Sequence, residues 1–207
     1  TTTGADCVAV GKGALDANTT GGSNVAVGKQ SLSTSTTLSG ITAIGHQALS
    51  ANTSGTGGVG VGYRALKANT TANNNTAVGY DAGAALTTGG QNTVVGTLAL
   101  DAATTADSNT AIGYLALSAN TTADNNTALG RSTLAANTTG AQNIAIGPYA
   151  LDANTTADDN IAIGYDCLGG NTTGAGNVAI GRNALYANTT ASGNTAVGSE
   201  SLTANTT

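Results

Sequence analysis

The residues best suited to bind a ligand follow a glycine that recurs every 17 residues, from Gly11 to Gly198. Positions in each repeat are numbered from this glycine, so position +1 is the residue directly after it. Tyrosine and arginine are typical of binding surfaces, and a stripe of them at position +1 predicts a face for a host-surface glycan or protein. The candidate binding stripe consists of Tyr63, Tyr80, Tyr114, Arg131, Tyr165 and Arg182. The alternative, which we favour, is an exposed column in which Tyr63 and Tyr80 stack on each other.

Aspartates gather in the turn that ends each repeat, at Asp107, Asp124, Asp158 and Asp159. Stacked carboxylates could share a calcium ion, which prefers oxygen ligands. However, the glycine-aspartate nonapeptide typical of calcium-binding solenoids is absent, and other repeats carry glycine, serine or alanine at the same positions. We therefore favour solvated turn charges, and we expect neither a metal nor another cofactor.

The chain has two cysteines, Cys7 and Cys167, which lie nine repeats apart. If each repeat adds the spacing of one strand, the two residues are roughly 40 Å apart, which exceeds the reach of a disulfide bond. They are then free thiols or links between chains, and we favour small buried residues.

Catalysis has little support in the sequence. His46 is the single histidine, and no repeated nucleophile, metal-ligand cluster or phosphate-binding loop accompanies it. A hexapeptide-repeat acyltransferase would need apolar residues every six positions, whereas positions +5 and +11 are mostly polar. We therefore predict that the chain is not an enzyme.

Composition restricts the fold and the partners. The 207 residues include no Phe, Trp or Met, so any interior is narrow and filled by smaller aliphatic residues. The net charge is −5 and only 8% of residues are charged, which argues against binding to nucleic acid. No apolar run approaches the ~20 residues of a membrane span.

The repeat is strict, because the glycines keep their spacing through twelve copies with no insertion or deletion. Loops of globular proteins tolerate changes in length, so this fidelity indicates that every copy stacks in register on the next. The sequence predicts a single uninterrupted β-solenoid over residues 1–207, and we expect it to be a segment of a longer fibre protein. The repeated glycines are Gly11, Gly28, Gly45, Gly62, Gly79, Gly96, Gly113, Gly130, Gly147, Gly164, Gly181 and Gly198.

Two short strands are predicted in each repeat. The β-branched residues before the glycine predict the first strand, and Leu at position +4 with Ala at position +6 predicts the second. Both faces of the first strand are apolar, which is typical of a strand covered on both sides. We expect one face to line the interior and the alanine face to form a seam with another copy of the chain. The candidate seam consists of Ala77, Ala111, Ala128, Ala145, Ala162 and Ala179.

Asn and Thr recur at positions +7 and +8, where they would lie roughly 4.8 Å apart in a parallel stack. This spacing suits hydrogen bonds that run from repeat to repeat. We therefore expect polar ladders at the corners of the solenoid.

The phrases NVAVG at residues 24–28 and NIAIG at residues 143–147 and 160–164 resemble the head repeats of YadA-like trimeric autotransporter adhesins. The longer phrase, with YxALxANTTG, resembles repeats of bacteriophage tail fibres. The resemblance covers nearly the whole chain, although a 17-residue period is longer than is usual in autotransporter heads. It implies a left-handed, trimeric parallel β-roll in an extracellular or virion appendage.

These observations lead us to expect a structural and adhesive segment of a surface fibre, a homo-oligomer that does not insert into a membrane. The alternative is a self-assembling extracellular filament subunit, with solenoids stacked end to end. An ice-binding solenoid is a weaker alternative, because the Thr columns at positions +8 and +9 are adjacent in sequence and should not share a face.

Overall fold

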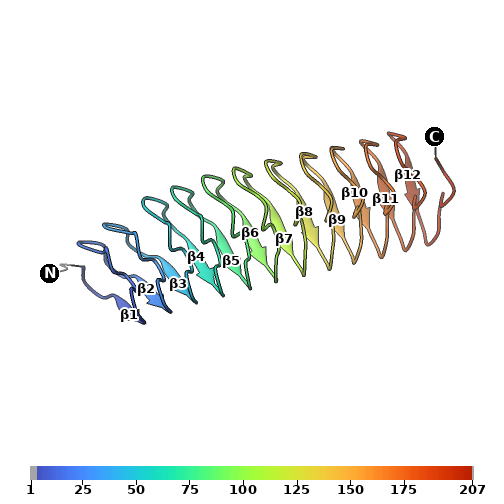
Figure 1. The fold of residues 1–207 in the computed structure, drawn as a ribbon. Helices are drawn as coiled ribbons and strands as arrows, with labels where there is room; N and C mark the ends of the chain where they lie inside the picture. The colour runs from blue at the N-terminus through green and yellow to red at the C-terminus, as the bar shows by residue number, and fades with distance from the viewer. Residues whose placement is uncertain (1–3, 207) are drawn as a thin grey trace.

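The computed structural model describes residues 4–206, and within them the chain forms twelve three-residue strands in one parallel sheet. Figure 1 shows the strands side by side in a single row along an elongated rod, one strand for each repeat. The predicted all-β parallel solenoid is thereby confirmed. No helix in the described part of the chain could cross a membrane. The strands are β1 (Val8–Val10), β2 (Val25–Val27), β3 (Thr42–Ile44), β4 (Val59–Val61), β5 (Thr76–Val78), β6 (Thr93–Val95), β7 (Thr110–Ile112), β8 (Thr127–Leu129), β9 (Ile144–Ile146), β10 (Ile161–Ile163), β11 (Val178–Ile180) and β12 (Thr195–Val197).

The register of the sheet places equal positions of the repeat beside each other. Thr110 pairs with Thr127 and Ala111 with Ala128, and every neighbouring pair of strands follows the same rule. Each repeat, called a coil below, therefore adds one layer to the rod. A single insertion would move every later side chain out of its column, which explains the strict length of the repeat.

The second predicted strand is wrong. Positions +1 to +6 form consecutive turns, and Leu at position +4 has a positive φ in every coil that carries it, for example 50° at Leu66 and 52° at Leu117. Position +2 also has a positive φ, for example 56° at Arg64. Backbone hydrogen bonds still join the coils here, since the Leu66 N–H donates to the Ala82 carbonyl at 3.0 Å. The alternation of apolar residues thus arises from alternating turn conformations instead of a pleated strand.

The interior is a narrow column of leucine against alanine. Leu66 and Leu117 at position +4 and Ala77 and Ala111 in the strands are completely buried. The alanines at position +6 are only half-buried. A second strand would have turned them inward together with the leucines at position +4, so this part of the prediction is also wrong. A small residue in the strand leaves room for the leucine opposite, so the core needs no aromatic side chain.

One coil shows how tightly this interior is filled. Gly83 replaces the usual leucine, and Leu86, which replaces the usual Asn at position +7, is completely buried. A Cβ atom added at Gly83 would lie 3.1 Å from Leu86 Cδ1 and from Leu66 Cδ2. Leu86 therefore fills the volume that Gly83 leaves, and the core density is kept by two compensating changes.

The repeated glycine is required by both backbone conformation and space. Gly113 has a φ of 139°, where side chains are strongly disfavoured. A Cβ atom on Gly113 would lie 2.6 Å from the carbonyl carbon of Gly130 in the next coil. The glycines thus bring successive backbones close together where each strand turns into the following segment.

A buried asparagine ladder at position −4 connects the coils just before the strands. The Asn109 N–H donates to Asn92 Oδ1 at 2.9 Å, and the Asn126 N–H donates to Asn109 Oδ1 at 2.9 Å. The Asn109 amide also donates to the Ala123 carbonyl at 2.9 Å. Asn109 is 1% exposed. Each asparagine therefore satisfies backbone groups that water cannot reach.

The hydrogen-bond ladders predicted at positions +7 and +8 are confirmed, but the threonine hydroxyls bond to backbone carbonyls and not to one another. Asn154 Nδ2 donates to Asn137 Oδ1 at 2.9 Å, so asparagine side chains do bond from coil to coil. The hydroxyl of Thr138 instead donates to the backbone carbonyl of Thr155 at 3.0 Å. The threonine column thus supports the backbone of the next coil and does not form a chain of hydroxyl groups.

We expect Gly113→Ala to lower the free energy of unfolding by about 3 kcal/mol or more, because it combines backbone strain with a clash. The matched control is Gly176→Ala, since Gly176 has a φ of 65° but no atom within 4 Å of an added Cβ. Urea unfolding followed by circular dichroism measures both. Equal losses in the two variants would contradict the role of the close contact.

We expect Asn109→Ala to lower the free energy of unfolding by about 3 kcal/mol, because the buried Asn126 N–H loses its acceptor and the Ala123 carbonyl keeps only the Asn120 amide as a donor. Thr122→Ala, at an exposed position in the next turn, should change it by less than about 0.5 kcal/mol. The same urea titration compares them. A loss at Asn109 no larger than that at Thr122 would show that the ladder contributes little.

Candidate binding surfaces

The candidate binding stripe lies on the surface as predicted. Tyr63, Tyr80, Tyr114 and Tyr165 are between 40% and 50% exposed, and Arg131 and Arg182 are exposed as well. Because all six occupy position +1 of a regular stack, the turn after each strand presents them along one edge. Thr97 and Pro148 interrupt the column, so the stripe consists of separate groups.

In the first group, His46, Tyr63 and Tyr80, the side chains contact one another. The rings of Tyr63 and Tyr80 are stacked with centroids 4.9 Å apart, and His46 stacks on Tyr63 at 5.2 Å. Arg64 lies 5.7 Å from the Tyr63 ring and pairs with Asp81, with 3.1 Å between Nε and Oδ1. The alternative of stacked tyrosines is therefore confirmed for this part of the stripe.

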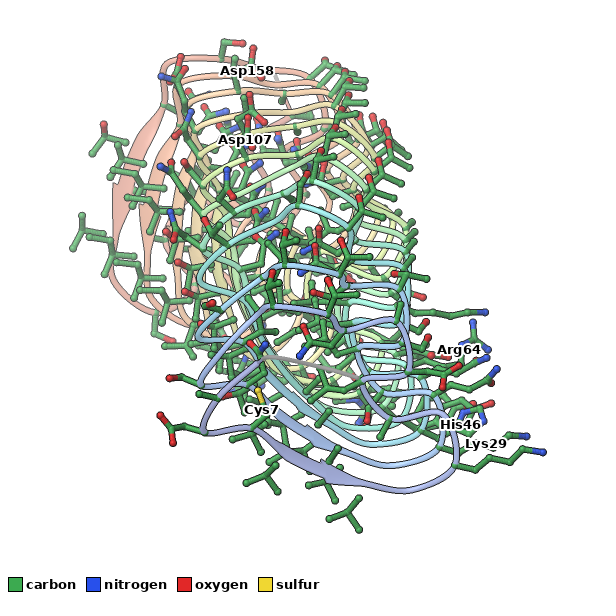
Figure 2. All side chains as sticks on the ribbon, turned by 90° about the vertical axis from the view of Figure 1, so that its left-hand side faces the viewer. Cys7, Lys29, His46, Arg64, Asp107 and Asp158 are labelled. Atoms are coloured by element: carbon green, nitrogen blue, oxygen red, sulfur yellow. The ribbon has the colours of Figure 1, made fainter. Side chains whose placement is uncertain are left out.

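Basic side chains extend this edge toward the N-terminal coils. Figure 2 shows Lys29, His46 and Arg64 projecting together from one edge, while Asp107 and Asp158 lie away from them. Lys12 and Lys29 border an open depression of about 610 Å³ together with Asp16. Both lysines are exposed and share the depression with polar groups, so the arrangement is a solvated surface without an enclosed site.

The second group of aromatic residues includes two that the sequence analysis missed. Tyr149 at position +2 and Tyr186 at position +5 join Tyr165 around a hollow of about 390 Å³. Gly169 and Gly170 also line it, at positions where other coils carry side chains. The paired glycine was the available signal, because it removes two side chains from otherwise regular columns.

Three of the four turn aspartates, Asp107, Asp124 and Asp158, have a structural role. Asp124 Oδ1 accepts the backbone N–H of Asp107 at 2.7 Å, and Asp158 Oδ1 accepts that of Ala141 at 2.7 Å. Each carboxylate thus bonds the turn of the preceding coil. Among residues 4–206, no three His, Cys, Asp or Glu side chains are grouped closely enough to hold a metal ion.

Both cysteines are free thiols, with Cys167 buried and Cys7 half-buried. Burial raises the pKa of the Cys167 thiol to about 11. Because the thiolate is the reactive form, this residue is a poor nucleophile near neutral pH, and it behaves as one of the small residues of the core.

The alanine seam requires a correction. The six alanines proposed for it are completely buried in the single chain and face its own interior. Small residues are needed there because the leucine column fills the opposite side. The apolar face that points outward consists of the residues on either side of the alanine, and any seam with another chain would have to use them.

This outward sheet face, formed by strand positions −3 and −1, carries no charged residue from β1 to β12. Position −1 is Val, Ile or Leu in every repeat, and position −3 is Val, Ile or Thr. Many of these side chains are more than one third exposed. The most exposed are Val8, Val10, Ile44, Val78, Val95, Leu129, Ile144, Ile180 and Val197.

Comparisons with protein-family models, with curated proteins and with solved structures give no match to this chain.

Proposed function

We propose that the chain is a structural and adhesive segment of an extracellular or virion surface fibre, in which several copies pack side by side along their outward sheet faces. The observation that carries the proposal is the continuous, uncharged face of the twelve strands, in which an unbroken aliphatic column at position −1 runs beside Val, Ile and Thr at position −3. Such a rod would project and stiffen the fibre, and the edge that carries the residues of position +1 would remain free to contact a host surface.

The size of the sheet face supports association. Twelve strands at the usual spacing make it roughly 55 Å long, and three residues make it about 10 Å wide. A flat, uncharged and largely apolar face of roughly 550 Å² lies at the upper end of the patch sizes that monomers expose. Since the face is uniform along the rod, it offers no isolated pocket for a small ligand.

A second copy of the chain is the partner that fits best. Its sheet face has the same spacing of aliphatic ridges, so contacts can repeat coil by coil along the whole length. The face also lacks charges that would have to be neutralised by a different partner. The resemblance to adhesin heads implies three copies around one axis. In that arrangement the outward sheet face of each copy would be covered by the other two.

The alternative, an end-to-end filament, is favoured by one separate observation. Residues 1–67 contain four Lys or Arg and two Asp, whereas residues 68–207 contain two Arg, eight Asp and one Glu. The first four coils therefore carry a net positive charge and the rest of the rod a net negative charge, and head-to-tail order would bring the negative part of one copy nearer to the positive part of the next. This field is screened by salt, so filaments of this kind would shorten as ionic strength rises. An ice-binding function is less favoured, because the hydroxyls at position +8 already bond to backbone carbonyls.

We expect the purified chain to sediment as a trimer and the double variant Leu129→Lys, Ile180→Lys to sediment as a monomer. Both side chains are exposed on the sheet face, at 44% and 39%, and burying unpaired charges there should weaken association by on the order of a hundredfold. Sedimentation velocity measures the mass, and circular dichroism confirms that the variant is folded.

Tyr114→Lys is the control, because Tyr114 is 47% exposed on a different edge of the rod. Its mass should equal that of the unmodified chain. A monomeric unmodified chain would refute side-by-side assembly, and long polymers that shorten in salt would favour the filament.

A further inference from the structure

The hollow formed by Tyr149, Tyr165 and Tyr186 exists because one coil lacks two side chains. Glycine occupies position +5 in this repeat alone, at Gly169, and position +6 in this repeat alone, at Gly170. A Cβ atom on Gly169 would overlap the carboxylate of Asp166 and would lie 3.2 Å from its Cγ. The Asp166 side chain therefore occupies the space above Gly169, and the glycine permits it to reach the hollow.

Three tyrosines from three successive coils surround this space. Tyr149 and Tyr165 meet edge to face, with centroids 6.0 Å apart and an interplanar angle of 78°. Tyr165 and Tyr186 keep about half of their surface exposed, at 48% and 47%. The Arg131 guanidinium lies 5.5 Å from the Tyr149 ring. Tyr165 and Tyr186 are not stacked face to face as Tyr63 and Tyr80 are, so their ring surface remains available to a ligand.

Two carboxylates share the hollow with the tyrosines. Asp152 and Asp166 both line it, and neither forms an ion pair with a basic side chain in the described part of the chain. Burial raises the pKa of both carboxyl groups, and the negative charge of Asp166 raises that of Asp152 further. The hollow therefore holds two partly desolvated, mutually repelling charges.

The chemistry of the lining selects the ligand. Two carboxylates with aromatic walls provide too few oxygen atoms for calcium, which takes six to eight. A neutral sugar could stack on the tyrosines, but it would leave the repulsion between Asp152 and Asp166 in place. An organic cation satisfies both features, since tyrosine faces attract ammonium groups and the carboxylates supply the opposite charge.

We infer that the hollow bounded by Tyr149, Tyr165, Tyr186, Asp152 and Asp166 binds an alkylammonium group, with the ammonium between the carboxylates and the alkyl part against the rings. The inference rests on the adhesive part of the proposed function, for which it names the chemistry of the partner. A lysine side chain of a protein and a choline headgroup of a lipid share this chemistry. The negative charge of residues 68–207 would attract either source.

The test uses the complete chain with ¹³C-labelled tyrosine rings and follows their chemical shifts by NMR. n-Butylammonium should shift Tyr149, Tyr165 and Tyr186 with saturation at concentrations on the order of millimolar. Tyr63, Tyr80 and Tyr114, the other three of the six tyrosines, serve as internal controls. Neutral n-pentanol and methyl glucoside should bind at least tenfold more weakly. Nα-acetyl-lysine amide and phosphocholine then distinguish the protein source from the lipid source by which binds more tightly.

Variants examine each part of the hollow. Asp166→Asn should weaken n-butylammonium binding about tenfold, and Gly169→Ala should weaken it similarly because the added methyl group displaces the Asp166 carboxylate. Asp159→Asn is the matched control, since it removes the same charge from an exposed turn position with a φ of 60°, and it should leave binding unchanged. Binding should also disappear as pH falls far enough to protonate both carboxyl groups.

The proposal is overturned if n-butylammonium gives no saturable shift, if n-pentanol or methyl glucoside binds as tightly, or if Asp159→Asn weakens binding as much as Asp166→Asn. Sedimentation of the same samples separates this result from the proposed function. A trimer without ammonium binding would refute the hollow's role alone, and ammonium binding by a monomer would refute side-by-side assembly alone.

Discussion

The close approach of successive backbones at the repeated glycine is the constraint on which the rest of the structure depends. At Gly113 the backbone adopts a φ of 139° and an added Cβ would lie within 2.6 Å of the next coil. This contact sets where each strand ends and how the coils superimpose. Since the asparagine ladder, the alanine column and the leucine column each need the same superposition, a change of register would disrupt all of them together.

The sequence made the solenoid predictable because the constraint is visible in it as fixed spacing. The strand before each glycine was also predictable, since β-branched residues flank a small residue in nearly every copy. The conformation of positions +1 to +6 was not. Alternation of Leu66 with Ala68 agrees with a pleated strand, but it agrees equally with turns of alternating hand, and the positive φ of 50° at Leu66 has no residue signature. Leucine is accepted there because its burial outweighs the cost of the conformation.

Which face of each strand points into the core also depends on the conformation of positions +1 to +6. If each repeat has a second strand, several combinations of columns can close the interior, and the sequence pattern then predicts that the alanines face outward. In the structure the inward turn of Leu117 and its equivalents leaves space for a methyl group only, so alanine faces the core and the larger aliphatic residues face outward. This inversion moves the apolar surface available to a partner from Ala111 to its neighbours Thr110 and Ile112.

The fold depends on backbone contacts and buried ladders, so binding specificity in such a rod can arise only from the exposed side chains at its edges. The ladders and the glycine contacts hold nearly the same geometry in every coil, so the edge positions are free to vary without cost to the fold. Tyr63 and Tyr80 lie in consecutive coils, and their rings stack on each other. At Gly169 and Gly170 variation removed side chains instead, so that tyrosines and carboxylates from three coils border one open hollow, and neither carboxylate forms an ion pair in the described part of the chain. A repeat that is regular everywhere else thus acquires a distinct local chemistry through the loss of two side chains.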